Sequence, residues 1–348
     1  MKRVTTTTVA LLGGLGLLAA GVASAQTLGG FPIREPRAGP QGSAPGGAGA
    51  RPGRAPQQIV VDVNGPGPYK SIAKAVNDVA EGGIVYIMHG VYNETVKLDK
   101  SVFIQGDRGP GSGVSIVAPM NQPCLKFSPK EGTAHAVVAN VSFQAEKFTR
   151  SDACVEVESG VFTMKESHEF ASTTAPAVRI TGGTVMLEKN RISDGSEGVM
   201  LQQSHTLSQS FIIDNKIGGN KVGVDISNGS RSDVVVAGNE IYDNDESGIK
   251  SSGFGGASLI GNKIRNNKGA GIYLDRHSKL ALVRFNEIVK NKGDGVAVPF
   301  GANGIIEDNN IVGNEGLGIY FRQGLEPKIT NNFLENNKGD GKRPKRGR

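Results

Sequence analysis

Tryptophan is absent from this 348-residue chain, and aromatic residues make up only 5% of it. Grooves that bind sugars tightly usually present exposed aromatic faces, so this composition disfavours tight glycan binding. Cysteine is scarce too: Cys124 and Cys154 are the two present, and no Cys/His pattern has the spacing of a metal site. The sequence therefore predicts no metal site and no cofactor, with a bound calcium ion as the open alternative.

Long apolar runs are also missing after residue 25, so the mature chain is expected to have no transmembrane segment. Residues 1–25 have the pattern of a secretory signal peptide: Lys2 and Arg3, an apolar run over residues 9–20, and a small-residue Ala-Ser-Ala ending at Ala25. Cleavage after Ala25 predicts a periplasmic or secreted protein, and an uncleaved N-terminal anchor is the alternative.

Basic residues gather at the two ends of the chain. Residues 26–57 are rich in Gly, Pro, Ala and Arg, and residues 338–348 are rich in Lys and Arg; both are expected to be disordered. The formal net charge is +6, of which the leader contributes +2, the linker +3 and the tail +5, leaving −4 for the folded body. A mildly acidic body argues against nucleic-acid reading by the core, whereas the basic ends suit anionic polymers.

One short phrase recurs seven times between residues 190 and 337. It reads Asn-x-Ile, then a second Asn five residues after the first, then Gly-Ile or Gly-Val. The first Asn stands, at steps of 22 to 25 residues, at Asn190, Asn215, Asn239, Asn262, Asn286, Asn309 and Asn331. The second stands at Asn220, Asn244, Asn267, Asn291, Asn314 and Asn336, with Gly195 in the first copy. The glycine of the pair stands at Gly198, Gly223, Gly248, Gly271, Gly295 and Gly318. A period of this size over seven copies is typical of a solenoid.

Apolar residues alternate within each copy, as in Ile272 and Leu274, which indicates strands rather than helices. Three short strands joined by bends would fill each repeat, as in one coil of a parallel β-helix. Coils stack at about 4.8 Å, so equivalent positions form columns. The Asn columns are expected to form amide ladders, or to adopt the left-handed backbone of tight bends. The repeat Gly marks another bend or a place without room for a Cβ.

The folded region is expected to span residues 58–337. Residues 71–80 predict an amphipathic helix, with Ser71 as its N-cap and Gly82-Gly83 as its stop, which would cap the open end of the core. Strand-like runs follow at residues 84–88, 95–98, 101–105, 114–118, 137–143, 155–164 and 178–187. Cys124 and Cys154 are a little more than one coil apart, so they form either a disulfide between neighbouring coils or two buried thiols.

The start of this region is similar to that of the pectin-lyase-like superfamily. The resemblance is carried by residues 69–72 (Tyr-Lys-Ser-Ile), 81–87 (Glu-Gly-Gly-Ile-Val-Tyr-Ile) and 90–96 (Gly-Val-Tyr-Asn-Glu-Thr-Val). It implies an all-β fold, a right-handed parallel β-helix with an N-terminal cap helix. Pectin methylesterases share this opening, but without Trp their Arg-Pro-Trp motif is absent here, so Glu94 is expected to be structural.

Candidate site residues come from the columns after the repeat Gly. The residues two and four places after it are expected to point outward on one face. The charged or phenolic residues at these positions, together with the two residues of the bend after Asp275, are Asp225, Lys250, Tyr273, Asp275, Arg276, His277, Tyr320 and Arg322.

This mixture suits a lyase or C5-epimerase acting on a polyuronate. A cation neutralises the uronate carboxylate, a base removes the C5 proton, and an acid returns or donates one. Lys250, Arg276 or Arg322 is expected to neutralise, His277 to act as base, and Tyr273 or Tyr320 to act as acid. Asp225 is grouped with Lys250, Asp275 and Tyr320 for substrate binding.

Residues 273–278 (Tyr-Leu-Asp-Arg-His-Ser) also resemble the Asp-Pro-His motif of mannuronan C5-epimerases, which share this fold. Asp275 and His277 match, whereas Arg276 replaces the Pro. The alternative is that Arg276 and His277 form a solvated bend of a structural coil.

Two functions therefore stand side by side. The first is an exported β-helix protein that binds or modifies an acidic polysaccharide or cell-envelope glycan, by lyase or C5-epimerase chemistry if it is an enzyme. The second is a non-catalytic envelope or surface scaffold. A bare last coil exposes strand edges, so a partner at the C-terminal end is also expected, unless the basic tail blunts those edges.

Overall fold

The structure is a computed structural model that describes residues 56–108, 113–145, 153–171, 174–203, 208–227, 232–253, 256–275, 278, 281–300, 304–322 and 327–339. The predicted signal peptide, nearly all of the predicted linker and nearly all of the basic tail lie outside these residues. Among the described residues, no helix is long and apolar enough to cross a membrane.

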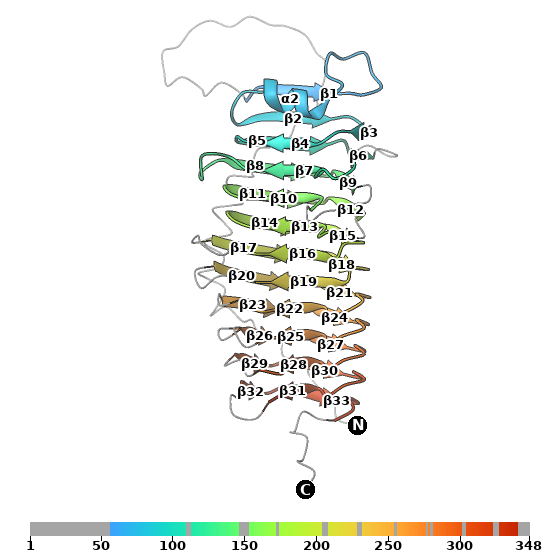
Figure 1. The fold of residues 1–348 in the computed structure, drawn as a ribbon, viewed down its shortest axis with the longest axis vertical. Helices are drawn as coiled ribbons and strands as arrows, with labels where there is room; N and C mark the ends of the chain where they lie inside the picture. The colour runs from blue at the N-terminus through green and yellow to red at the C-terminus, as the bar shows by residue number, and fades with distance from the viewer. Residues whose placement is uncertain are drawn as a thin grey trace, which may run out of the picture. The chain divides into compact units, whose positions relative to one another are not determined.

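The described strands form three faces of a parallel β-helix, in which each coil stacks on the one before it (Figure 1). The twelve-stranded face contains β1 (Gln58–Val61), β2 (Gly83–Ile87), β5 (Val102–Gly106), β8 (His135–Ala139), β11 (Val161–Lys165), β14 (Thr184–Glu188), β17 (Ser208–Ile213), β20 (Ser232–Ala237), β23 (Gly256–Ile260), β26 (Leu282–Arg284), β29 (Ile305–Glu307) and β32 (Lys328–Thr330).

The ten-stranded face contains β4 (Val96–Leu98), β7 (Leu125–Phe127), β10 (Val155–Val157), β13 (Val178–Ile180), β16 (Glu197–Leu201), β19 (Val222–Ile226), β22 (Ile249–Ser251), β25 (Ile272–Leu274), β28 (Val296–Val298) and β31 (Ile319–Phe321). The third face has two parts, β3 (Gly90–Asn93), β6 (Val114–Ala118), β9 (Ser142–Ala145) and β12 (His168–Ala171), then β15 (Arg191–Ser193), β18 (Lys216–Gly218), β21 (Glu240–Tyr242), β24 (Lys263–Arg265), β27 (Glu287–Val289), β30 (Asn310–Val312) and β33 (Phe333–Glu335).

The predicted cap helix is present as α2 (Ile72–Asp78), two residues shorter than expected because the backbone is already extended at Val79. The Ser71 hydroxyl accepts a hydrogen bond from the Lys74 N–H, as an N-cap does. The Glu94 carboxylate accepts hydrogen bonds from the N–H groups of Ile72 (2.7 Å) and Ala73 (3.1 Å). Glu94 therefore has the structural role that the sequence predicted.

Three strand-like runs of the sequence each divide into two strands. The run over residues 137–143 bends at Asn140, that over 155–164 at Gly160, and that over 178–187 at Gly183, all at positive φ. The strands predicted in these runs are confirmed, and the bends within them were not marked in the sequence because the apolar pattern continues across each bend. Each run crosses from one face to the next.

The two Asn columns form buried ladders. Asn262 shows the pattern: its Oδ1 accepts from the N–H (3.0 Å) and Nδ2 (2.9 Å) of Asn239, and its own Nδ2 donates to Asn286 Oδ1 (3.0 Å). The residue before each ladder Asn takes the positive φ instead, as Gly261 does at +63°. The amide ladder is thus confirmed, and the left-handed backbone belongs to the preceding residue.

The last coil corrects the predicted register by one residue. Asn309 donates to Asn332 Oδ1 (2.8 Å) and Asn314 donates to Asn337 Oδ1 (2.9 Å), so Asn332 and Asn337 continue the ladders. Asn331 and Asn336, which the repeat pattern selected, take the positive φ of the bend instead, each at +55°. Both positions in each bend are Asn, so the pattern alone could not separate them.

The repeat glycines are required by close packing rather than by a bend. A Cβ at Gly223 would lie 2.4 Å from the Gly248 carbonyl oxygen and 2.7 Å from Ile241 Cγ2, which excludes any larger residue. Because these glycines have no Cβ, neighbouring coils can pack closely enough beside them for the Asn ladder to form.

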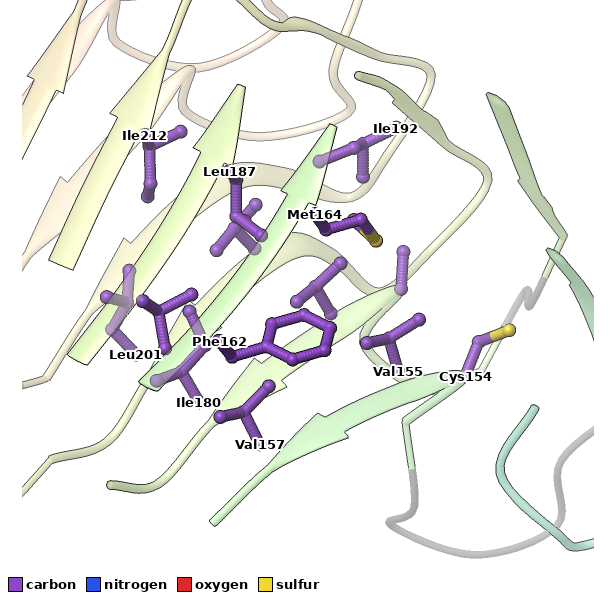
Figure 2. Close-up of a cluster of buried hydrophobic side chains, with 14 of the residues drawn as sticks. Cys154, Val155, Val157, Phe162, Met164, Ile180, Leu187, Ile192, Leu201 and Ile212 are labelled. Carbon is purple, nitrogen blue, oxygen red and sulfur yellow. The ribbon is translucent and has the colours of Figure 1, made fainter. Parts of the chain in front are cut away.

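The core runs inside the coils, and side chains from all three faces meet there. Figure 2 shows Phe162 and Leu187 from the twelve-stranded face beside Val157 and Ile180 from the ten-stranded face, with Ile192 from the third. Cys124 and Cys154 form a disulfide between neighbouring coils, which decides the alternative that the sequence left open.

Candidate functional site

The central residues of the ten-stranded face form one continuous outward row. Parallel register places in this row, in order, Lys97, Lys126, Glu156, Arg179, Met200, Asp225, Lys250, Tyr273, Ala297 and Tyr320. The predicted alignment of Asp225, Lys250, Tyr273 and Tyr320 is therefore confirmed. We call this set the charged row.

Asp225 and Lys250 form the centre of the predicted site. The Lys250 ammonium lies 3.6 Å from the Asp225 carboxylate, and the Ser227 hydroxyl donates to the same carboxylate at 3.1 Å. Asp225 is only 6% exposed, whereas the Lys250 side chain is 40% exposed. The buried Asp225 carboxylate thus positions the Lys250 side chain. The Lys250 ammonium is the part of the pair that a ligand can reach.

Tyr273 lies one coil beyond Lys250, in direct register with it. Burial raises the pKa of the Tyr273 phenol, the Asp275 carboxylate raises this pKa further, and Lys250 lowers it. A raised pKa keeps the hydroxyl protonated at neutral pH, so Tyr273 can donate a hydrogen bond or a proton but is a poor base.

Tyr320 and Arg322 lie at the far end of the row. Ala297 separates Tyr273 from Tyr320, so these two residues are two coils apart, or about 10 Å. The Arg322 side chain is exposed at the end of β31. The structure therefore brings Asp225, Lys250 and Tyr273 together, and places Tyr320 and Arg322 at a distance that only an extended ligand could bridge.

Arg276 and His277, the predicted cation and base, lie outside the described residues. Ser278, which follows them, is 1% exposed and donates to the Ser251 carbonyl oxygen (2.6 Å), so its side chain faces inward. Asp275, which precedes them, is half-buried at the end of β25. The roles of Arg276 and His277 remain predictions.

A second charged group on the same face was missed in the sequence. Lys126 lies 2.6 Å from Glu158 and 3.7 Å from Glu156, and Arg179 lies 3.9 Å from Glu156. The hydrogen bond to Glu158 raises the pKa of Lys126. Arg179 Nε is buried and has no hydrogen-bond partner among the described residues. The repeat fades before residue 190, so no sequence column marked these residues as neighbours.

Metal ligation finds no support in the described part of the chain, where no three His, Cys, Asp or Glu side chains form a cluster that could hold an ion. The two carboxylates of the charged row, Glu156 and Asp225, are separated by Arg179 and Met200, and each has a cation within 4 Å. What the row offers chemically is alternating charge with phenol hydroxyls, suited to an extended, charged and hydroxyl-rich ligand.

The family described as "Right handed beta helix region" matches residues 131–279 and 250–343, more than half of the chain. No curated protein matches. Among solved structures, the Azotobacter vinelandii mannuronan C-5 epimerase AlgE4 A-module is similar at 16% identity, covering 78% of this chain and 91% of that one, with a TM-score of 0.53.

Two further structures are similar at lower scores. The periplasmic alginate epimerase AlgG has 14% identity, covering 80% of this chain and 85% of that one, with a TM-score of 0.46. The pectate lyase Pel9A has 12% identity, covering 83% and 80%, with a TM-score of 0.44. At such identities, likeness to solved structures speaks for the fold alone. The family match shows that this chain belongs to the right-handed β-helix family, and the likeness to the AlgE4 A-module supports the same fold.

Proposed function

We propose that this chain is an exported β-helix protein that binds or modifies an acidic polysaccharide along its ten-stranded face. The observation that carries the proposal is the in-register succession of Asp225, Lys250 and Tyr273 on three consecutive coils. A partly exposed ammonium, held by a buried carboxylate and followed by a protonated phenol, suits a ligand that presents carboxylates beside hydroxyl groups.

An extended chain lying along the charged row would meet these groups in turn. Lys250 would pair with a uronate carboxylate, and its pairing with Asp225 fixes the ammonium before the ligand arrives. Tyr273 and Tyr320 would then contact successive parts of the chain, and Arg322 would meet a second carboxylate beyond them.

Lyase or C5-epimerase chemistry would add a base to this arrangement. Neutralising the uronate carboxylate acidifies the C5 proton, which His277 is proposed to remove. The Tyr273 phenol would then protonate C5 from the other side in an epimerase, or the leaving oxygen in a lyase. Similarity to the AlgE4 A-module, whose name is that of a mannuronan C-5 epimerase, supports this choice of substrate class.

Export is supported by two independent features. The leader has the signal-peptide pattern, and Cys124 and Cys154 pair as a disulfide, which persists in oxidising compartments. These two features support the proposal that the protein is periplasmic or secreted.

Proton NMR of the purified protein with alginate, pectate and a neutral glycan tests the proposal. Tyr273→Phe and His277→Ala are expected to abolish new unsaturated-uronate or epimer signals, whereas Tyr242→Phe, on the third face, is expected to leave them unchanged. Lys250→Ala is expected to weaken binding, and Lys263→Ala, also on the third face, is its control. Unchanged spectra with all three glycans would refute a polysaccharide function on these substrates.

A non-catalytic scaffold is the second candidate, and the Asp225–Lys250 pair favours it in one respect. Each charge already has a partner, so the row is stable without a ligand. Broadened glycan lines without new signals would establish a binding protein that performs no chemistry on the sugar.

A further inference from the structure

The outer surface of the twelve-stranded face is apolar along its central row. Parallel register places in this row, from first strand to last, Gln58, Ile84, Phe103, Val137, Thr163, Met186, Phe211, Val235, Ser258, Leu282, Ile305 and Lys328. Its apolar members are partly exposed, and Ile305 is 37% exposed. We call this set the apolar row.

The other two faces have no such row in the described residues. The charged row holds six ionisable Lys, Glu, Arg and Asp side chains, and the outward row of the third face reads Arg191, Lys216, Glu240, Lys263, Glu287, Asn310 and Phe333. The twelve-stranded face is thus apolar on both of its sides. Sheets of this kind are normally covered by another structural layer.

We propose that the twelve-stranded face packs against the same face of a second copy of this chain, with the order of coils reversed and β20 opposite β20. A half-turn about an axis parallel to β20 produces this arrangement. It keeps each outward row opposite the same row of the partner copy, at the spacing of about 10 Å that is usual between packed sheets.

Charges beside the apolar row specify this arrangement. The neighbouring outward row reads, from β11 to β29, Lys165, Glu188, Ile213, Ala237, Ile260, Arg284 and Glu307. With β20 opposite β20, Lys165 meets Glu307 of the second copy and Glu188 meets its Arg284. Ile213 meets Ile260 between them, so opposite charges flank an apolar centre on both sides.

Registers shifted by one coil place like charges together. A shift in one direction sets Glu188 opposite Glu307, and a shift in the other sets Lys165 opposite Arg284. Such repulsion disfavours the neighbouring registers, much as charge patterns select partners in other interfaces. Within one copy Arg284 already pairs with Glu307 (3.3 Å) and Asp308 (3.2 Å), which reduces the repulsion in every register. Asp233 is exposed at the edge of this face and lies opposite Asp233 of the second copy in the proposed register. Solvent screens the repulsion between these two carboxylates.

The size of the surface is sufficient for a dimer. Nine strands, β8 to β32, overlap in this register, and at about 4.8 Å a strand and about 16 Å of strand length they cover roughly 700 Å² on each copy. Interfaces of about 800 Å² per partner are the standard size for specific complexes.

Analytical ultracentrifugation of the purified protein at about 100 µM, well above the Kd of a micromolar interface, tests the proposal. The protein is expected to sediment as a dimer. Val235→Lys, which puts two like charges on the symmetry axis, is expected to give a monomer. Val289→Lys, the matched change on the third face, is expected to leave the dimer intact. Circular dichroism melting checks that each variant is folded.

A second pair of variants identifies the register. Glu188→Arg sets two cations opposite each other and is expected to raise the dimer dissociation constant roughly tenfold or more. Adding Arg284→Gln should then recover most of the lost affinity. Glu188 and Arg284 are four coils apart in one chain, about 19 Å, so such recovery can arise only between copies. Glu287→Arg, on the third face, is the control.

A wild-type protein that is monomeric at this concentration would overturn the proposal. So would a dimer that Val235→Lys leaves intact, since another surface would then hold the copies together. A dimer lost in Val235→Lys but unaffected by the Glu188 and Arg284 changes would overturn the proposed register. Glycan NMR with the Val235→Lys protein separates this proposal from the function of the ten-stranded face, which the change does not touch.

Discussion

Removing one amide from the middle of the first Asn ladder should destabilise the protein strongly. In Asn262→Ala, the Asn239 N–H loses its acceptor (3.0 Å), and the Val236 carbonyl loses a donor (2.8 Å). The two hydrogen bonds between the side-chain amide of Asn262 and those of Asn239 and Asn286 are lost as well. A buried unpaired N–H costs about 1–3 kcal/mol and each lost neutral hydrogen bond about 0.5–1.5 kcal/mol, so we expect a loss of about 3–5 kcal/mol.

Urea denaturation followed by circular dichroism measures this loss as a shift of the midpoint. Asn332→Ala, at the half-buried end of the same ladder, should lose only about 1 kcal/mol, because water can replace the missing amide. Lys263→Ala, next to Asn262 but exposed, is the control for changes at the surface. Equal losses at Asn262 and Asn332, or a loss below 1 kcal/mol at Asn262, would refute the ladder as a source of stability.

Three other changes test the cap, the disulfide and the half-buried His135. Glu94→Ala should cost about 2 kcal/mol in urea denaturation, because two helix N–H groups lose a charged acceptor; a neutral result would mean that water replaces the carboxylate. Replacing Cys124 and Cys154 together by Ala should cost about 3–4 kcal/mol, since their bond closes a loop of 30 residues, and an unchanged midpoint would contradict this. Burial lowers the pKa of His135, so its contribution to stability is complete above its ordinary value of about 6.5 and is lost as pH falls through the lowered pKa. The melting temperature should therefore fall from pH 7 to pH 5, and His135→Gln should reduce that fall; an equal fall in both proteins would assign it to other groups.

The sequence predicted the fold because the repeat carries its own physical reasons. Each coil needs an amide at the ladder position and a glycine where neighbouring coils approach most closely. The spacing of both residues can be read from the sequence without knowing any tertiary contact. It also predicted the alignment of Asp225, Lys250 and Tyr273, because parallel coils in register turn a repeat position into a column. It could not choose between Asn331 and Asn332, since both are Asn and only the hydrogen bond from Asn309 selects one.

Only the tertiary structure determined the side-chain contacts and the burial that depend on residues of neighbouring coils. Before residue 190 the repeat fades, so the approach of Lys126 to Glu156 and Glu158 could not be deduced from spacing. The burial of Asp225 and the exposure of Lys250, which separate a supporting role from a ligand-facing one, depend on the side chains above and below them.

The same is true of the apolar row. Phe211 and Val235 look like ordinary strand residues in the sequence, because a strand with apolar residues on both sides reads as fully buried. Only the closed coil shows which side faces the core, and so leaves the other side as a surface. The sequence by itself therefore determined the coil, its columns and the outward side of the ten-stranded face, whereas the structure determined which side of the twelve-stranded face points outward and which groups meet there.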